Sequence, residues 1–357
     1  MTAEAPYQAL AERLHSLPNG FPATRSGVER RLLAMLFTPD QAALAAQLRL
    51  TKETAGEIAR RLDRDPGETR ALLKSMARAG CIAAERSDAG IVYGLMPFVV
   101  GIYEMQVSRM ETELARLFED YYQETFGTAL AYEPSFHRVI PVQESVHFEN
   151  QIQPFEHVST ILESARSWGV MDCICRKQKA LIGDPCDHPV DVCMVLGSVP
   201  NAFDKNETIR GLTLEQAREA LRFAAEAGLV HCVSNNQKGI HYICNCCTCS
   251  CGILRGIADF GVANVVAHSS YVNTVEDGTC IECELCLGHC PFDALSLTTS
   301  FQIDQERCVG CGVCVQHCPE EALKLVLREE AQTPPETIKE WGLLRASQRG
   351  LDLRDVL

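Results

Sequence analysis

The sequence predicts an α+β protein with a helical N-terminal domain, a cysteine-rich α+β middle domain and a C-terminal domain containing an internal repeat. Its 357 residues suffice for two or three domains of about 150 residues each. The composition, 46% hydrophobic and 22% charged, is that of a globular chain. Only Cys81 of the 19 cysteines precedes residue 170. We expect a helical domain at 1–100, a helical connector at 101–165, a cysteine-rich metal-binding domain at 166–270, the repeat domain at 271–330 and a terminal helix within 331–357.

Charge and cysteine content limit the class of protein. The net charge is −14, but residues 1–100 have a balance of +2 and the remainder −16, so the acidity belongs to the cysteine-bearing part. Met1–Leu17 has charges and no apolar core of a secretion signal. The longest apolar run, Ile91–Tyr103, contains Pro97 and is too short to span a membrane. We therefore expect a cytoplasmic protein with reduced, metal-binding cysteines rather than disulfides.

The N-terminal domain shows helix signals followed by a hairpin signal. Apolar residues recur at helical spacing over 29–37, 41–50 and 51–62. Asp65 and Pro66 open the next helix, with Glu68 in the place of a capping-box partner and Gly80 at the expected end. Two apolar runs within 81–95 enclose polar turn residues and predict a β-hairpin.

Residues 58–94 thus resemble the winged helix-turn-helix modules of small bacterial regulators. The resemblance rests on the order of elements and on no invariant chemistry. It implies either DNA binding or a winged helix used for protein docking or dimerisation. One face of the second helix would present three cations, Arg70, Lys74 and Arg78. Three carboxylates flank that helix, those of Asp63, Asp65 and Glu68. Because DNA binding depends on neutralising phosphates, docking is favoured over DNA.

Three further segments have helical or mixed patterns. Residues 106–126 contain an apolar stripe, Met110, Leu114, Phe118 and Tyr122, typical of a helix that faces a core or a second copy of the chain. Residues 131–157 read as strands and connections, with three histidines that we interpret as structural: His137, His147 and His157. Leu214–Ala227 is a helix capped by Thr213. Near the C-terminus, Ile338, Trp341, Leu343 and Leu344 predict a short amphipathic helix that docks on this chain or on a partner.

The C-terminal repeat consists of two cysteine runs, Cys280–Pro291 and Cys308–Pro319. Each run is C-x2-C-x2-C-x3-C-P and is followed by Ala-Leu. The segment 279–327 resembles the bacterial two-cluster ferredoxin, and the resemblance implies two [4Fe–4S] clusters. By position, one would be held by Cys280, Cys283, Cys286 and Cys318, and the other by Cys308, Cys311, Cys314 and Cys290. Two zinc sites would more often show paired C-x2-C groups.

The two runs differ at two positions. Glu282 and Glu284 stand in the first run where the second has Gly310 and Gly312. Acidic side chains disfavour the addition of an electron to a neighbouring cluster. We therefore expect the cluster of the first run to have the lower reduction potential.

A second group of cysteines lies between residues 173 and 251. Its candidate metal ligands are Cys173, Cys175, Cys186, Cys193, Cys244, Cys246, Cys247, Cys249 and Cys251, and Cys232 precedes the second half of them. Residues two apart on an extended segment face the same way, so neighbouring cysteines can share a site. The favoured interpretation is a third iron–sulfur cluster on Cys173, Cys175, Cys186 and Cys193; zinc is the alternative, and metal-free thiols remain a third.

Two features indicate what reaction the chain could support: the cations that follow Cys175 and the absence of known catalytic motifs. Arg176, Lys177 and Lys179 can offset the charge of a cluster or bind an anionic substrate. No nucleotide-binding glycine motif and no nucleophile–base pattern is present, so no catalytic residue is assigned.

The sequence therefore favours an iron–sulfur protein that relays electrons to or from a partner oxidoreductase, as an electron-transfer component more than a stand-alone enzyme. The alternatives are a redox-sensing winged-helix transcriptional regulator and a catalytic reductase subunit acting at the Cys173–Cys251 field.

Overall fold

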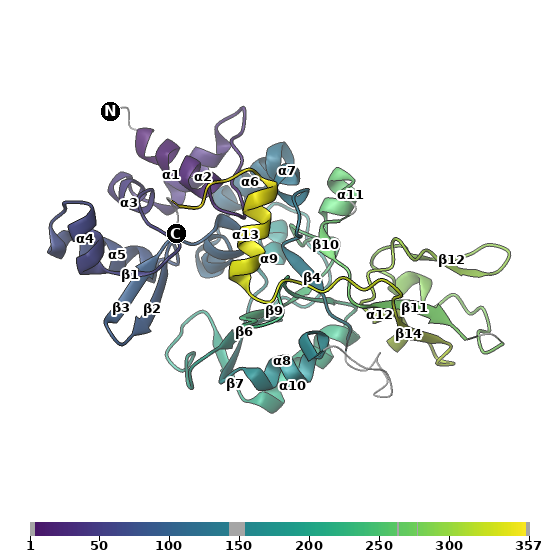
Figure 1. Cartoon of the computed structure of the whole chain (residues 1–357). Helices are drawn as coiled ribbons and strands as arrows, with labels where there is room; N and C mark the ends of the chain where they lie inside the picture. Colours follow the sequence, from purple (N-terminus) through teal and green to yellow (C-terminus); the bar gives the residue numbers. More distant parts are fainter. Residues whose placement is uncertain (1–3, 143–153, 263, 277, 355–357) are drawn as a thin grey trace. The chain divides into compact units, whose positions relative to one another are not determined.

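The computed structural model describes residues 4–142, 154–262, 264–276 and 278–354 (Figure 1). The chain forms two compact units. One comprises Met1–Glu133, Ala180–Asp184 and Gly342–Leu357, and the other comprises Pro134–Lys179 and Pro185–Trp341. Both contain helices and strands, which agrees with the α+β class.

The first unit is mainly helical. Its helices are α1 (Ala5–His15), α2 (Val28–Leu36), α3 (Pro39–Ala45), α4 (Ala55–Arg61), α5 (Pro66–Arg78), α6 (Thr112–Tyr121) and α7 (Gly127–Leu130). Irregular helical turns lie at Phe98–Ile102, Glu104–Arg109 and Tyr122–Phe126. Its strands β1 (Glu53–Thr54), β2 (Ala83–Ser87) and β3 (Gly90–Gly94) form an antiparallel sheet in the order β1-β3-β2.

Local capping explains where these helices begin and end. The Asp65 carboxylate accepts a hydrogen bond from the Glu68 backbone N–H (2.8 Å), as an N-cap should. Gly80 adopts φ +69° after α5, where glycine avoids the strain of a left-handed residue. The helix predicted at 51–62 begins only at Ala55, because Thr54 caps α4 and pairs with β3.

The stripe predicted for 106–126 is buried, at 6% exposure or less for all four of its side chains. The helix itself is not continuous, because Met110 has an extended backbone conformation between a 3-10 turn and α6. The stripe therefore faces the core of the first unit.

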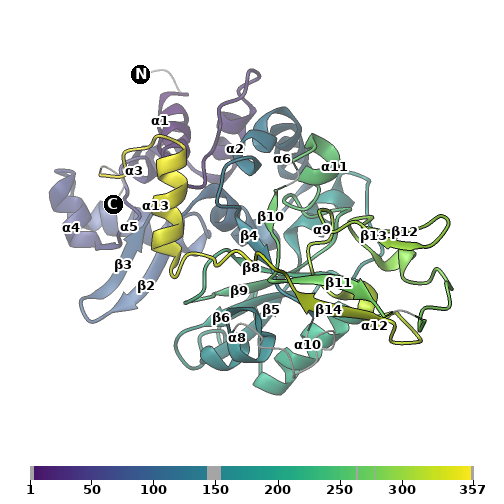
Figure 2. The same cartoon turned by 45° about the vertical axis from the view of Figure 1, so that its right-hand side comes forward.

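The second unit is built on a seven-stranded sheet in the order β10-β4-β8-β9-β6-β5-β7 (Figure 2). Its strands are β4 (His137–Val139), β5 (Ser167–Met171), β6 (Cys193–Gly197), β7 (Arg210–Leu212), β8 (Val230–Ser234), β9 (Tyr242–Cys246) and β10 (Val266–Ala267). Neighbours are antiparallel except β10 and β4, which are parallel. The helices are α8 (Val158–Ser164), α9 (Ile174–Leu181), α10 (Leu214–Glu226) and α11 (Gly256–Phe260), with a 3-10 turn at Pro154–Glu156.

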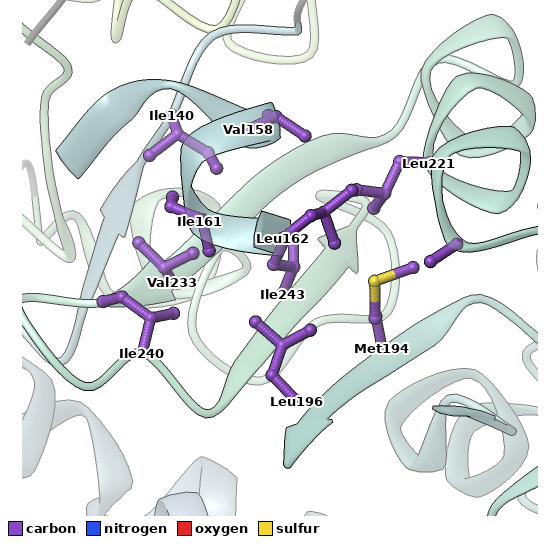
Figure 3. Packing of buried hydrophobic residues seen from close by; sticks show 11 residues of the cluster. Ile140, Val158, Ile161, Leu162, Met194, Leu196, Leu221, Val233, Ile240 and Ile243 are labelled. Atoms are coloured by element: carbon purple, nitrogen blue, oxygen red, sulfur yellow. The ribbon is translucent and has the colours of Figure 1, made fainter. Parts of the chain in front are cut away.

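Side chains alternate between the two faces of this sheet along each strand, so that one face is apolar and the other presents cysteines. Met194, Val233 and Ile243 belong to the buried apolar cluster that includes side chains of α8 and α10 (Figure 3). The predicted helix at Leu214–Ala227 is confirmed as α10, with a capping box at Thr213 and Ala217 and Leu221 buried. Since successive side chains on a strand point to opposite faces, Cys193, Cys232 and Cys244 are on the other face.

The C-terminal part of the second unit contains two short antiparallel pairs. They are β11 (Tyr271–Val275) with β14 (Leu323–Leu327) and β12 (Leu295–Leu297) with β13 (Phe301–Ile303). A 3-10 turn (Leu287–His289) lies in the first cysteine run and α12 (Val313–Gln316) in the second, at positions that overlap under the offset between the runs.

The terminal helix α13 (Ile338–Gln348) forms as expected. The Trp341 indole N–H donates to the Ser135 carbonyl (3.0 Å) within the second unit. Leu343 and Leu344 are exposed, so only part of the predicted apolar stripe packs on the chain. Among the described residues, no helix is long and apolar enough to cross a membrane.

Candidate metal centres

The first cysteine set of the repeat lines one small hollow that is open to solvent. Its lining includes all four cysteines that the ferredoxin resemblance assigns to one cluster: Cys280, Cys283, Cys286 and Cys318. Burial, followed by the charges of neighbouring thiolates, raises the pKa of Cys286 to about 11. Thiols in such a place keep their protons unless a metal replaces them, so the hollow suits a metal centre.

The second set is more deeply enclosed. Cys308, Cys311 and Cys314 are all buried, and Cys290 and Cys308 act electrostatically on the Cys311 thiol. Burial, the largest cause, raises the pKa of Cys311 to about 12. The structure thus brings together the second assigned set as well.

The backbone conformation is repeated at equivalent positions of the two cysteine runs, as the sequence is. Left-handed φ angles occur at Glu282 (55°) and Glu284 (62°), and at the equivalent positions of the second run, Gly310 (71°) and Gly312 (77°). Asp293 (49°) and Glu321 (51°), which follow the fourth cysteines, are related in the same way. The residues that replace glycine in the first run therefore keep its backbone conformation, at the cost of strain that glycine avoids.

Several hydrogen bonds reach the sulfurs of the second set. The buried Asn273 side chain donates to Cys314 Sγ (3.2 Å), and its backbone N–H lies 3.5 Å from Cys308 Sγ. The Ala294 N–H donates to Cys290 Sγ (3.3 Å). The offset that relates the two cysteine runs takes Asn273 to Phe301, whose ring lines the first hollow. Such N–H···S bonds stabilise thiolate charge and raise the potential of a bound cluster.

Among the cysteines between residues 173 and 251, the register of the sheet brings together residues that are distant in the sequence. Cys232 on β8 is opposite Cys244 on β9. Met194 pairs with Ile243, so the adjacent residues Cys193 and Cys244 come side by side on the same face. Cys244 interacts with both Cys193 and Cys246, and Cys246 interacts with Cys232.

Three further cysteines, Cys173, Cys175 and Cys251, join this face from outside the sheet. Cys173 interacts with Cys175 and Cys193, and Cys175 interacts with Cys251. The expectation of an extended segment at 173–175 is wrong, because β5 ends at Met171 and Cys175 lies in the first turn of α9. We call Cys173, Cys175, Cys193, Cys244, Cys246 and Cys251 the six-cysteine group.

Cys186 lies apart from that group, although the favoured ligand set joins it to Cys173, Cys175 and Cys193. The loop after α9 places Cys186 beside His188, Cys247 and Cys249 instead. Strand β9 ends at Cys246, and the following turn sends Cys247 and Cys249 to this site while Cys251 returns to the six-cysteine group. One segment thus supplies both sites.

Arg176 lies between the thiols of the two sites. Its side chain is 2% exposed, and its Nη2 donates to the Asn245 carbonyl (2.6 Å). Nε and Nη1 have no hydrogen-bond partner within the described part of the chain. Burial lowers the pKa of Arg176, but the thiolates of Cys173 and Cys247 oppose this and raise it above its ordinary value. A buried guanidinium needs nearby negative charge, which metal-bound thiolates provide. The neighbouring Lys177 is half-buried and pairs with Asp172 (3.8 Å).

Two of the three histidines interpreted as structural lie among the described residues, and their surroundings differ. His137 is buried within 4.8 Å of the ligand atoms of Cys232 and Cys246, and burial lowers its pKa to about 4. His157 caps α8, and His147 lies outside the described residues. Sequence reasoning missed His137 and His188 as candidate ligands; only the Cys186-Asp-His188 spacing offered a local signal. Cys81 is buried against the Leu36 carbonyl, which agrees with core packing.

Comparison with protein families supports the repeat domain. Residues 301–324, which contain the second cysteine run, match the model of a 4Fe-4S binding domain. The C-terminal part therefore contains a ferredoxin-type iron–sulfur domain able to hold at least one [4Fe–4S] cluster. Comparisons with curated proteins and with solved structures find no match to the chain.

Proposed function

We propose that this chain is a cytoplasmic electron-transfer protein with two [4Fe–4S] clusters in residues 271–330 and a third iron–sulfur centre on the six-cysteine group. The observation that carries the proposal is the repetition of left-handed backbone positions around two complete cysteine sets. A single-cluster domain would need only one such set. Repetition of both ligands and backbone therefore supports a second cluster in the first run.

A short stretch of backbone joins the seven-stranded sheet to the repeat domain, and it supports electron transfer between these two regions. Val139 pairs with Cys232, and the Ile140 N–H donates to the His231 carbonyl (3.0 Å). Three residues along from Val139, the Val142 N–H donates to the Cys311 carbonyl (2.9 Å). Three extended residues span at most about 10 Å. Because electron tunnelling weakens steeply with distance, this short covalent and hydrogen-bonded route favours exchange between the two regions.

The six-cysteine group offers more thiolates than one cube requires. A [4Fe–4S]²⁺ core with four thiolates has a net charge of −2, and burial of that charge is unfavourable without a cation. Arg176, whose Nε and Nη1 have no hydrogen-bond partner among the described residues, supplies that cation. This supports iron–sulfur chemistry on the six-cysteine group and gives Arg176 a positioning and electrostatic role.

A winged-helix module for docking a redox partner is the proposed role of the first unit. The order α3, β1, α4, α5, β2, β3 and the sheet order β1-β3-β2 support this module. Arg70, Lys74 and Arg78 are exposed on α5, where an acidic protein surface can bind them. Redox-dependent DNA binding is the alternative, and it would make the chain a regulator.

The electron-transfer proposal is tested by reductive titration of the anaerobically prepared full chain, followed by electron paramagnetic resonance. Each cluster should accept one electron reversibly and return it to a one-electron acceptor. Cys283→Ala and Cys311→Ala should each remove about four irons and leave the other ferredoxin cluster reducible. If both variants lose the same single signal, the two-cluster proposal fails.

A further inference from the structure

The four residues Cys186, His188, Cys247 and Cys249 form a site separate from the six-cysteine group. Cys186 and His188 come from the loop between α9 and β6, and Cys247 and Cys249 from the turn after β9. All four offer a ligand atom within 4.8 Å of every other. Two separate loops thus converge with four ligands of the types that zinc prefers.

The size of the site discriminates between one ion and a cluster. Four atoms no more than 4.8 Å apart lie within about 3 Å of a common centre, whereas zinc–ligand bonds measure about 2.0–2.3 Å. A cube of four irons and four sulfides cannot fit inside that space, because its thiolates bind at separate corners. The site therefore has room for a single metal ion.

The separations between these ligand atoms also match the edges of a zinc tetrahedron. Tetrahedral bonds of about 2.3 Å to sulfur and about 2.05 Å to nitrogen place two sulfurs about 3.8 Å apart and sulfur and nitrogen about 3.6 Å apart. The Cys186 and Cys247 sulfurs are 3.9 Å apart. Cys249 Sγ and His188 Nδ1 are 3.6 Å apart.

The surroundings complete a ligand shell of this kind. The Ser250 hydroxyl donates to Cys186 Sγ (3.3 Å), an outer-shell bond that fixes a thiolate ligand. Cys247 is buried while Cys249 is exposed, so an ion can enter from the solvent side. Three thiolates and one imidazole saturate a tetrahedral ion and leave no open position, which is the pattern of a structural zinc site.

We propose that Cys186, His188, Cys247 and Cys249 bind one structural zinc ion, distinct from the iron–sulfur clusters. The ion fastens the loop at 185–192 to the turn after β9. Cys246, the last residue of β9, and Cys251 stand on either side of this turn and belong to the six-cysteine group, so zinc holds their backbone in place. This inference goes beyond electron transfer and does not depend on it.

The test measures zinc and iron together in the full chain, prepared anaerobically with its iron sites filled. We expect about one zinc ion per chain, with three sulfurs at about 2.3 Å and one nitrogen at about 2.0–2.1 Å by X-ray absorption. His188→Ala and Cys249→Ala should raise the zinc dissociation constant at least about 100-fold, since even outer-shell changes cost 10–100-fold. His188→Cys should retain zinc with four sulfurs, which separates ligand loss from misfolding.

Matched controls come from the same unit. His241→Ala removes an exposed histidine, and Thr248→Ala alters the same turn without removing a ligand; both should bind zinc as the unmodified chain does. The inference is overturned if the iron-loaded chain binds no zinc, if iron occupies the four-ligand site, or if His188→Ala and Cys249→Ala bind zinc as tightly as His241→Ala. Iron content reports the clusters separately, so failure of the electron-transfer proposal remains distinguishable.

Discussion

Gly310 provides the sharpest test of the repeat domain. It precedes Cys311 and adopts φ +71°, and a β-carbon there would collide with the Tyr271 carbonyl oxygen and Ser269 Oγ. Tyr271 is fully buried in β11, and the Ser269 N–H is bonded to the Val309 carbonyl (3.0 Å). The Tyr271 carbonyl cannot move without disturbing β11, and the Ser269 hydroxyl can turn away only by losing its hydrogen bond to the Gly310 carbonyl (2.9 Å). Gly310→Ala should therefore be strongly destabilising.

The magnitude follows from two separate costs. A left-handed conformation costs an L-residue about 1–2 kcal/mol, and overpacking costs about 1–3 kcal/mol. Their sum lowers the free energy of unfolding by about 2–5 kcal/mol. For a unit of this size, spanning Pro134–Lys179 and Pro185–Trp341, each kcal/mol shifts Tm by about 2–4 °C. The expected fall in Tm is therefore roughly 4–20 °C, with loss of the cluster held by Cys308, Cys311, Cys314 and Cys290.

Glu282→Gly is the matched control, because Glu282 has the equivalent position and an exposed side chain with φ +55°. Relief of about 1–2 kcal/mol of strain, less the entropy cost of glycine of about 0.5–1 kcal/mol, predicts a small stabilisation. The assay is anaerobic thermal unfolding followed by circular dichroism and cluster absorbance, with iron analysis before heating. A Gly310→Ala chain that retained all its iron and melted within about 2 °C of the unmodified protein, a margin near the effect of one kcal/mol, would refute this reasoning.

Three further predictions concern the reduction potential of the first-run cluster, the positive charge of Arg176 beside the six-cysteine group, and docking by the winged-helix module. Replacing Glu282 and Glu284 together by glycine should raise the potential of the first-run cluster, because two negative charges beside it are removed; a redox titration that finds both potentials unchanged contradicts this. Arg176→Met should lose the iron of the six-cysteine group but keep that of residues 271–330, whereas Arg176→Lys should retain part of it; equal iron in both variants counts against the countercharge role. Alanine at Arg70, Lys74 and Arg78 should weaken binding of an acidic redox partner at low salt by about tenfold or more, through loss of electrostatic attraction. The unmodified chain should not retard its own upstream DNA in either redox state, and retardation lost in the triple variant would instead support the regulator.

Local signals were sufficient to predict much of the fold. Asp65-Pro66 and Thr213 mark helix starts that the structure reproduces, because caps act within one turn. The error at 51–62 has a distant cause. The two-residue strand β1 pairs with β3, and Thr54 becomes the cap of α4, so the helix begins later than its periodicity indicates. Strand β3 lies beyond α5 and β2 in the chain, so no periodicity within the helix could indicate this pairing.

The metal sites show the same difference between local and distant determinants. The C-x2-C-x2-C-x3-C-P runs place most ligands of a cluster on one loop, so their spacing alone was informative. The partners of Cys186 could be predicted only by knowing the turn after β9. This turn sends Cys246 and Cys247 to two different sites. His137 reaches Cys232 only through the pairing of β4 with β8. These contacts depend on sheet register, which the sequence spacing of the cysteines does not contain.

The central claim is tested most directly by iron and acid-labile sulfide analysis of the anaerobically reconstituted full chain. Two ferredoxin clusters and a third cube predict about 12 irons and an equal amount of sulfide per chain. About eight would limit iron–sulfur chemistry to residues 271–330 and remove the third centre from the six-cysteine group. Fewer than four irons would contradict the account of this chain as an iron–sulfur electron-transfer protein.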